Sequence, residues 1–100
     1  MGFYERVWDK IKEIPTGKVS TYGNVAKALH SKAFRAVGSA LRYNPYAPKV
    51  PCHRVINSNG DIGNYSGSGG VERKIELLRK EGVEVVNNKI DLKKYLHKFN

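Results

Sequence analysis

The chain has 100 residues, with 18 Lys and Arg against nine Asp and Glu, a formal net charge of +9 and a hydrophobic content of 40%. This length fits one domain with a modest core. The positive charge favours a polyanionic partner, nucleic acid before an anionic membrane surface, although it also serves solubility. A single cysteine excludes an internal disulfide and any zinc site built mainly on cysteines, and the histidines show no metal-ligand spacing. No apolar run approaches the roughly 20 residues of a membrane span.

The first half of the chain is expected to hold three helices. Residues 3–14 carry an apolar stripe at helical spacing. Ser20 or Thr21 caps a second helix that runs to about residue 30. Residues 32–43 form a third helix, rich in small and basic side chains. Two short helices joined by a tight turn indicate a helix-turn-helix, although small residues also suit ordinary helix–helix packing.

The second half is expected to begin with a small β wing. Residues 55–56 are β-prone, Asn59-Gly60 is a strong hairpin signal, and a second strand around Ile62 completes the wing. A helix over 71–81 follows. Its inner face and its stop are predicted from apolar spacing and from a glycine, namely Val71, Ile75, Leu77, Leu78 and Gly82.

The last part of the chain is predicted to contain a strand over 83–85 and a short basic helix within 91–98. Before that strand, Glu81 ends the 71–81 helix. A carboxylate at the C-terminal end of a helix is disfavoured by the helix dipole. This mild misfit suggests another duty for Glu81, although a solvated surface glutamate is the simpler interpretation.

The single cysteine stands in the run Pro51-Cys52-His53-Arg54-Val55. A thiol reacts as its thiolate, and neighbouring basic groups favour that form. Residues 44–51 hold three prolines, which exclude a helix and give a stiff arm that presents the cysteine. A lone cysteine is also commonly a small buried hydrophobe. The motif by itself leaves a nucleophile and a packing residue as alternatives.

Four runs together carry a family resemblance: IPTGKVSTYG, KAFRAVGSALRYNP, VPCHRVINSNGDIGNYSG and the helix that ends in KEG. On these runs, which cover about residues 3–86, the chain resembles the O6-alkylguanine-DNA alkyltransferases, also called methylated-DNA–protein-cysteine methyltransferases. The expected fold is a mainly α, winged helix-turn-helix-like single domain over residues 1–100, with a small β wing. The expected function is DNA repair by direct reversal, in one turnover, on O6-alkylguanine, with O4-alkylthymine as a second candidate substrate.

The resemblance assigns the catalytic roles to four residues. Cys52 matches the acceptor that takes the alkyl group from a guanine flipped out of the duplex. His53 matches the base that activates the thiol through a water. Glu81 matches the carboxylate that orients this histidine. Asn44 matches the hinge asparagine that braces the active-site segment.

Base recognition and DNA contacts are assigned in the same way. Tyr22 and Ser66 match residues that hydrogen-bond the flipped guanine, and Val55 matches a pocket-wall position whose carbonyl contacts the base. Arg35 matches the arginine that enters the stack where the base has left.

The remaining DNA contacts follow from the helix-turn-helix and the wing. Arg42 and Ser58 match phosphate-contact positions. The family docks its helix-turn-helix in the minor groove, and the small residues of 36–40, Gly38 among them, suit that close approach. The expected partner is double-stranded DNA. The resemblance implies no cofactor, metal or membrane, and we expect a monomer.

A free thiol suits a reducing intracellular compartment, so we expect a cytoplasmic, nucleoid-associated or nuclear protein. Many family members carry a further N-terminal domain, whereas the resemblance here begins at residue 3. The basic tail, residues 87–100, lies outside the resemblance and is a candidate cover for the face left exposed.

Two alternatives remain at this point. Alkyltransferase-like proteins of the same family recognise lesions without repairing them, and they carry a non-nucleophilic residue, commonly tryptophan, at the position of Cys52. A cysteine hydrolase that uses Cys52, His53 and Glu81 would instead turn over many substrates through an acyl intermediate.

Overall fold

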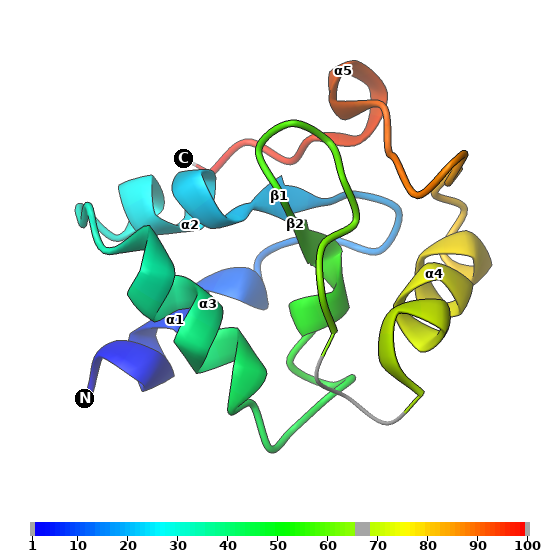
Figure 1. Cartoon of the computed structure of the whole chain (residues 1–100). Coiled ribbons are helices and arrows are strands. Elements are labelled where there is room, and N and C mark those ends of the chain that lie inside the picture. Colours follow the sequence, from blue (N-terminus) through cyan, green and yellow to red (C-terminus); the bar gives the residue numbers. More distant parts are fainter. Residues whose placement is uncertain (1, 66–68, 100) are drawn as a thin grey trace.

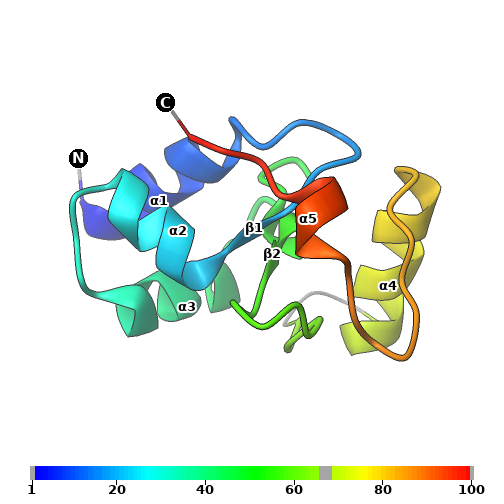
Figure 2. The ribbon, with the colours of Figure 1, turned by 90° about the horizontal axis from the view of Figure 1, so that it is seen from above.

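The computed structural model describes residues 2–65 and 69–99. Within these residues the chain is mainly helical, with one short sheet between two groups of helices (Figures 1 and 2). The elements in chain order are α1 (Phe3–Ile11), β1 (Ser20–Thr21), α2 (Tyr22–Ala28), α3 (Phe34–Arg42), the 3-10 turn η1 (Cys52–Arg54), β2 (Val55–Ile56), α4 (Gly70–Lys80) and α5 (Leu92–Tyr95). The predicted mainly helical fold with a small β element is confirmed.

The three N-terminal helices form where the sequence predicts them, with shorter bounds. α1 stops at Ile11, because the next residues close a tight turn before Pro15, in which the Ile14 amide donates to the Ile11 carbonyl at 3.0 Å. Thr21 caps α2, and its hydroxyl accepts the amide of Asn24 at 3.1 Å. α2 and α3 then form the predicted helix–turn–helix pair.

The short sheet is assembled differently from the predicted hairpin. β2 pairs in parallel with β1, in a register that sets Ser20 opposite Val55. The Asn59-Gly60 turn is present, since the amide of Gly60 donates to the carbonyl of Asn57 at 2.9 Å. Ile62 does not return to β2, however, and its amide donates to the carbonyl of Asn88. Both strands are fully buried, so each is stabilised by neighbours on both faces, which a local turn signal cannot specify.

α4 confirms the predicted helix 71–81 within a residue at each end. Leu78 is fully buried and Val71, Ile75 and Leu77 are half-buried, while Gly82 ends the helix at a φ of +89°. The strand predicted over 83–85 is wrong: this segment is not paired as a strand, and it is held by burial of Val83 and Val85.

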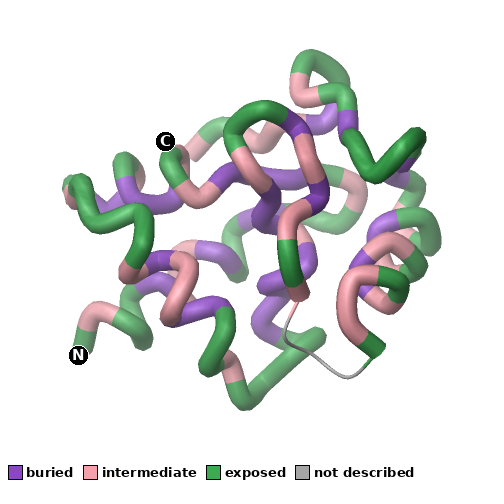
Figure 3. The backbone as a smooth tube through the Cα atoms, viewed as in Figure 1, coloured by how far each residue is buried: buried purple, intermediate pink, exposed green. Residues whose placement is uncertain are grey.

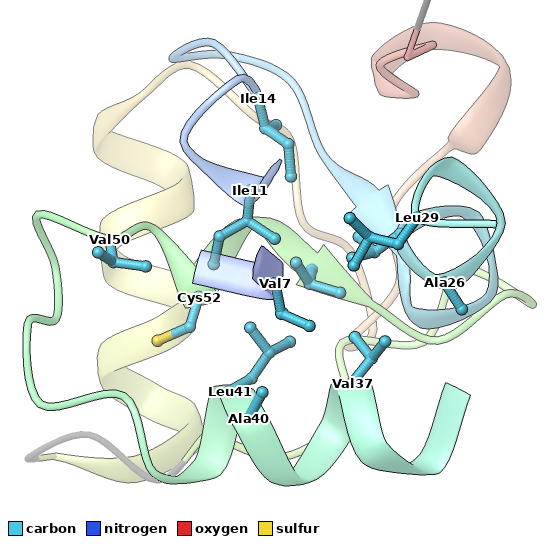
Figure 4. Packing of buried hydrophobic residues seen from close by; sticks show 12 residues of the cluster. Val7, Ile11, Ile14, Ala26, Leu29, Val37, Ala40, Leu41, Val50 and Cys52 are labelled. Carbon is cyan, nitrogen blue, oxygen red and sulfur yellow. The ribbon is translucent and has the colours of Figure 1, made fainter. Parts of the chain in front are cut away.

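Two hydrophobic clusters flank the sheet. The first joins α1, α2 and α3 to the arm before η1, and Figure 4 shows its side chains converging from these elements. The second lies between the sheet, α4 and the C-terminal segment, and includes Ile56, Ile62, Leu78 and Tyr95. Figure 3 shows the buried backbone running through the centre of the molecule, at the strands and on the inner faces of the helices.

The C-terminal tail is built into this core. It forms the predicted short basic helix, α5, and the structure shows that the side chain of Asp91 caps it. The chain then runs beside Val19, whose amide donates to the Tyr95 carbonyl at 2.9 Å and whose carbonyl accepts the His97 amide at 2.7 Å. Phe99 packs against the first cluster. The tail therefore runs along the sheet beside Val19, and its expected role as a cover for the face left exposed stays a prediction.

In the part of the chain that the structure describes, no helix has the length and the apolar character needed to cross a bilayer.

The tail's contribution to stability can be measured. Tyr95 is 8% exposed within the second cluster, so Tyr95→Ala should lower the free energy of unfolding by about 3 kcal/mol. Lys93→Ala, an exposed change in the same helix, is the control and should be close to neutral. Equal urea midpoints for the two variants would contradict a tail that belongs to the core.

Candidate functional site

Cys52 opens the 3-10 turn η1 at the end of the proline-containing arm. Its side chain is 6% exposed and stands at the edge of the first cluster, with the sulfur directed away from Val7 and Ile11 (Figure 4). Cys52 lines a cavity of about 670 Å³. Besides Cys52, the cavity is lined by Tyr22, Gly38, Leu41, Arg42, Asn57, Gly63, Asn64, Tyr65, Gly70 and Val71. Cys52 is thus nearly buried, yet it borders a space large enough for a small planar group.

His53 lies behind Cys52 and is 1% exposed. Its Nε2 atom is 3.0 Å from Oε2 of Glu81. Burial lowers the pKa of His53, and the neighbouring Glu81 carboxylate offsets this only in part, so the imidazole is neutral at pH 7. Its Nδ1 atom is buried and has no hydrogen-bond partner among the described residues.

The protonation of this pair follows from its partners. Burial alone would raise the pKa of Glu81, but hydrogen bonds from Arg54 and His53 outweigh it and lower the pKa, so Glu81 is a carboxylate. A carboxylate only accepts, so Nε2 of the neutral His53 must carry the hydrogen. Nδ1 is then a bare acceptor, which is the state of a general base.

Arg54 holds the Glu81 carboxylate from the other side. Its Nε donates to Oε1 at 2.8 Å and its Nη2 donates to Oε2 at 2.7 Å, a bidentate pair. Nη1 of the same guanidinium donates to the carbonyl of Ile14 at 2.8 Å, and Nη2 reaches Thr16 Oγ1 at 3.1 Å. Arg54 therefore ties η1, the end of α4 and the turn after α1 together. The sequence pattern marked Arg54 only as a charge beside the cysteine.

Two tyrosines stand close to Cys52. Tyr22 lies in the first turn of α2, and burial raises its pKa, with a further increase from Cys52. Burial and the same cysteine also raise the pKa of Tyr65. Both hydroxyls are protonated at neutral pH and can donate into the cavity. Tyr65 was not among the predicted site residues. The sequence feature that could have indicated it is an aromatic side chain in a glycine-rich loop.

Asn44 braces the arm that leads to Cys52. Its Nδ2 donates to the carbonyl of Val50 at 2.8 Å, and its Oδ1 accepts the amide of Tyr46 at 2.9 Å. The side chain thereby joins the start of the arm to its end, two residues before the cysteine. This geometry suits the expected bracing role.

The predicted DNA contacts are divided between the cavity and the outer surface. Gly38 and Arg42, one turn apart on α3, line the cavity. A Cβ on Gly38 would meet no atom within 4 Å, so the glycine leaves open space beside α3. Arg35 is exposed in the first turn of α3, and Ser58 is exposed in the turn after β2; neither lines the cavity.

Two predicted base contacts are placed differently from the rest. Ser66 lies outside the described residues. Val55 is fully buried in β2 and does not line the cavity, and its carbonyl accepts Nζ of Lys74 at 2.9 Å. Lys74 is 1% exposed and was missed by the sequence patterns. The spacing of Lys74, three residues after Val71 and four before Leu78, places it inside the apolar stripe of the helix and could have indicated its burial.

The described residues contain no group of three or more His, Cys, Asp or Glu side chains that could hold a metal ion.

Comparison with known proteins places this site in a family. Residues 2–83 match the profile of the 6-O-methylguanine DNA methyltransferase, DNA binding domain. Alkyltransferase-like protein 1 of Schizosaccharomyces pombe is 40% identical over an alignment of 102 positions, which covers 96% of this chain and 94% of that protein. The methylated-DNA–protein-cysteine methyltransferase of Methanosarcina acetivorans is 48% identical over 81 residues, 80% of this chain but 51% of that protein.

Among solved structures, too, the chain matches the S. pombe protein over nearly its full length and a methyltransferase over about half of its length. The S. pombe protein Atl1, in complex with damaged DNA containing O6-carboxymethylguanine, superposes with a TM-score of 0.86 over 97% of this chain and 95% of that one, at 40% identity. Mycobacterium tuberculosis OGT in complex with DNA superposes with a TM-score of 0.75 over 81% of this chain and 50% of that one, at 43% identity. The likeness to Atl1 extends into the tail, beyond the expected limit at residue 86.

The chain spans about half the length, or less, of the methyltransferases that it matches. The matched profile covers the helix-turn-helix, the Cys52 turn and α4, which are the elements that build the cavity. The chain belongs to the 6-O-methylguanine DNA methyltransferase DNA-binding domain family, a family of proteins that bind or repair alkylated DNA.

Proposed function

We propose that this chain binds O6-alkylguanine in double-stranded DNA and transfers the alkyl group to Cys52. The observation that carries the proposal is Cys52 in the lining of the cavity, next to the His53–Glu81 pair, whose Nε2 and Oε2 atoms are 3.0 Å apart. The similar structures of S. pombe Atl1 and M. tuberculosis OGT are complexes with DNA, which supports DNA as the partner. The surplus of Lys and Arg, +9 overall, supports the same partner.

The lesion must leave the duplex before it can reach Cys52. The O6 atom of a stacked guanine is out of reach of a nearly buried thiol, so the nucleotide has to be extruded, at a cost of roughly a few kcal/mol. In the proposed complex, α3 lies against the minor groove with Gly38 allowing close approach. Arg35 then fills the gap in the stack that the flipped guanine leaves.

The transfer is a single displacement. His53 Nδ1 takes the thiol proton through a water, and the sulfur attacks the alkyl carbon. The bond from that carbon to O6 breaks, and its electron pair passes into the guanine ring. A tyrosine hydroxyl, from Tyr22, donates to the leaving base and stabilises the developing charge. The product is a thioether without a good leaving group, so each molecule acts once.

A second candidate is lesion recognition without transfer. The observation that favours it is the near end-to-end match with Alkyltransferase-like protein 1, whereas the methyltransferases extend well beyond the matched region. Cys52 favours transfer, because the alkyltransferase-like proteins are expected to hold a non-nucleophilic residue at this position. Both candidates share the cavity and the DNA-binding face, and they differ in the fate of the alkyl group.

Intact-mass measurement after mixing with duplex DNA that carries O6-methylguanine separates the candidates. We expect one methyl group on wild-type protein, located on Cys52, and none on Cys52→Ser. The serine variant should keep its preference for damaged over undamaged duplex, because binding rests on the pocket and on phosphate contacts. A lesion preference without any adduct on the wild type would establish the second candidate, and repeated release of product would indicate a hydrolase.

The role of Glu81 can be tested by Glu81→Gln. The Glu81 carboxylate raises the pKa of His53, so removing its charge leaves a weaker base, and we expect single-turnover transfer to slow by about 10²-fold. Glu84→Gln, an exposed change nearby, is the matched control. Melting curves for both variants check that the protein still folds when the contact between Arg54 and residue 81 is weakened. Equal rates for the two variants between about pH 6 and pH 9 would reduce Glu81 to a structural partner of Arg54.

Arg35 separates base extrusion from simple charge neutralisation. If its planar guanidinium fills the stack, Arg35→Lys and Arg35→Ala should both slow repair of duplex DNA, because a lysine ammonium cannot stack. The loss should shrink opposite a mismatch and vanish on free O6-alkylguanine base, which needs no extrusion. Lys32→Ala, an exposed change just before α3, controls for lost charge. Equal defects of the Arg35 variants on all three substrates would exclude the extrusion role.

A further inference from the structure

A buried lysine stands behind the wall of the Cys52 cavity. Lys74 lies in the middle of α4 and is 1% exposed. Its Nζ donates to the carbonyls of Val55 at 2.9 Å, Ile62 at 2.6 Å and Asn64 at 3.1 Å. These contacts use all three donors of an ammonium group, and every acceptor is a backbone carbonyl. Burying a charge among neutral acceptors is costly, so a residue kept there is a candidate for a specific task.

The three acceptors belong to the two segments that border the reactive cysteine. Val55 begins β2, directly after the η1 turn that carries Cys52. Ile62 and Asn64 flank Gly63, and the segment from Gly63 to Tyr65 lines the cavity. One ammonium group therefore joins the strand after the cysteine, the loop that forms a cavity wall, and helix α4.

We propose that Lys74 is a positioning residue, which as an ammonium ion fixes β2 and the 62–64 loop in the geometry that recognises the alkylated base. The inference rests on the proposed function, since the cavity it shapes is the proposed lesion site. Lys74 itself touches no reacting atom. Its effect passes through the carbonyls it holds and through Tyr65, which the held loop carries to the cavity.

The charge of Lys74 gives this role a pH signature. Burial lowers the pKa of Lys74 from 10.5 to about 8, and Cys52 offsets this in part. The titratable groups that act on it from η1 are Cys52 and His53. A neutral amine has two N–H donors, so one of the three carbonyls loses its partner once Lys74 is deprotonated.

The lowered pKa of Lys74 affects the stability of the fold in the opposite direction: deprotonation at high pH weakens the proposed lesion recognition but stabilises the fold. Because the pKa in the folded protein lies below that of the unfolded chain, the unfolded chain holds the proton at higher pH than the fold does. This group therefore makes the fold more stable, not less, as pH rises from about 8 to about 10.5. A loss of lesion recognition over this range without a loss of stability distinguishes positioning from a purely structural role.

The test compares Lys74→Met, Lys74→Arg and Lys80→Met, the last an exposed control on the same helix. Because Cys52 would remove the methyl group during the measurement, every Kd, that of the protein called wild type at position 74 included, is measured in the Cys52→Ser background. The readout is the ratio of Kd for undamaged duplex to Kd for duplex with O6-methylguanine, by fluorescence anisotropy. We expect Lys74→Met to reduce this ratio at least about tenfold, or about 1.4 kcal/mol, with affinity for undamaged duplex nearly unchanged. Lys74→Arg should restore part of the ratio, and Lys80→Met should leave it intact. In wild type the ratio should fall from about pH 7 to about pH 9, and in Lys74→Met it should stay flat.

A ratio in Lys74→Met equal to that of Lys80→Met would overturn the inference. If Lys74→Met does not fold, the wild type decides, and a ratio constant from about pH 7 to about pH 9 overturns it. A wild type without any lesion preference contradicts the proposed function instead. Alkylation of Cys52 by iodoacetamide, followed by intact mass, then tests the positioning alone: it should be at least about threefold faster in Lys74→Met than in Lys80→Met, because a loosened wall exposes the sulfur. Equal rates in these two variants would overturn the positioning role.

Discussion

The structure of the site depends on one ionised carboxylate, that of Glu81. Arg54 binds both of its oxygens, and His53 shares one of them. Because Arg54 also holds the turn after α1 through Ile14, this carboxylate connects the reactive turn, the end of α4 and the first helix. Removing one partner of this partly buried pair leaves the other charge without its counter-ion, which destabilises the fold. The contact therefore supports the fold and sets the protonation of the histidine at the same time.

These two duties respond to pH in the same direction. Hydrogen bonds hold the pKa of Glu81 below 4.5, so its contribution to stability is present at neutral pH and is lost as pH falls through its folded-state pKa. Burial holds the pKa of His53 below 6.5, so the fold also favours the neutral imidazole and loses stability as pH falls below 6.5. Acid therefore weakens the fold and protonates His53 together, so the neutral imidazole that the proposed transfer needs is present where the fold is also more stable.

Local chemistry in the sequence predicts much of this architecture. The apolar stripe of α1, the Thr21 cap of α2 and the Gly82 stop of α4 each act within a few residues, and each is found as predicted. The parallel pairing of β1 with β2 joins residues more than 30 positions apart, and no local signal encodes it. The burial of Lys74 was not predicted for a related reason. A lysine is normally a surface residue, and only the tertiary fold brings three carbonyls to its ammonium group.

The same scaffold fits a lesion binder and a repair protein, and the site indicates where they diverge. In both proposed functions the cavity, the α2–α3 pair and the braced arm recognise and hold a flipped base, whichever side chain stands at position 52. A buried neutral imidazole that donates from Nε2 to a carboxylate adds little to recognition, since His53 does not line the cavity. A buried ionisable pair costs desolvation energy, and such pairs are typical of functional sites where a neighbouring group gives up a proton. In the proposed transfer Cys52 supplies that proton, and so the pairing of this thiol with a neutral imidazole is the strongest physical argument for proposing transfer over recognition alone.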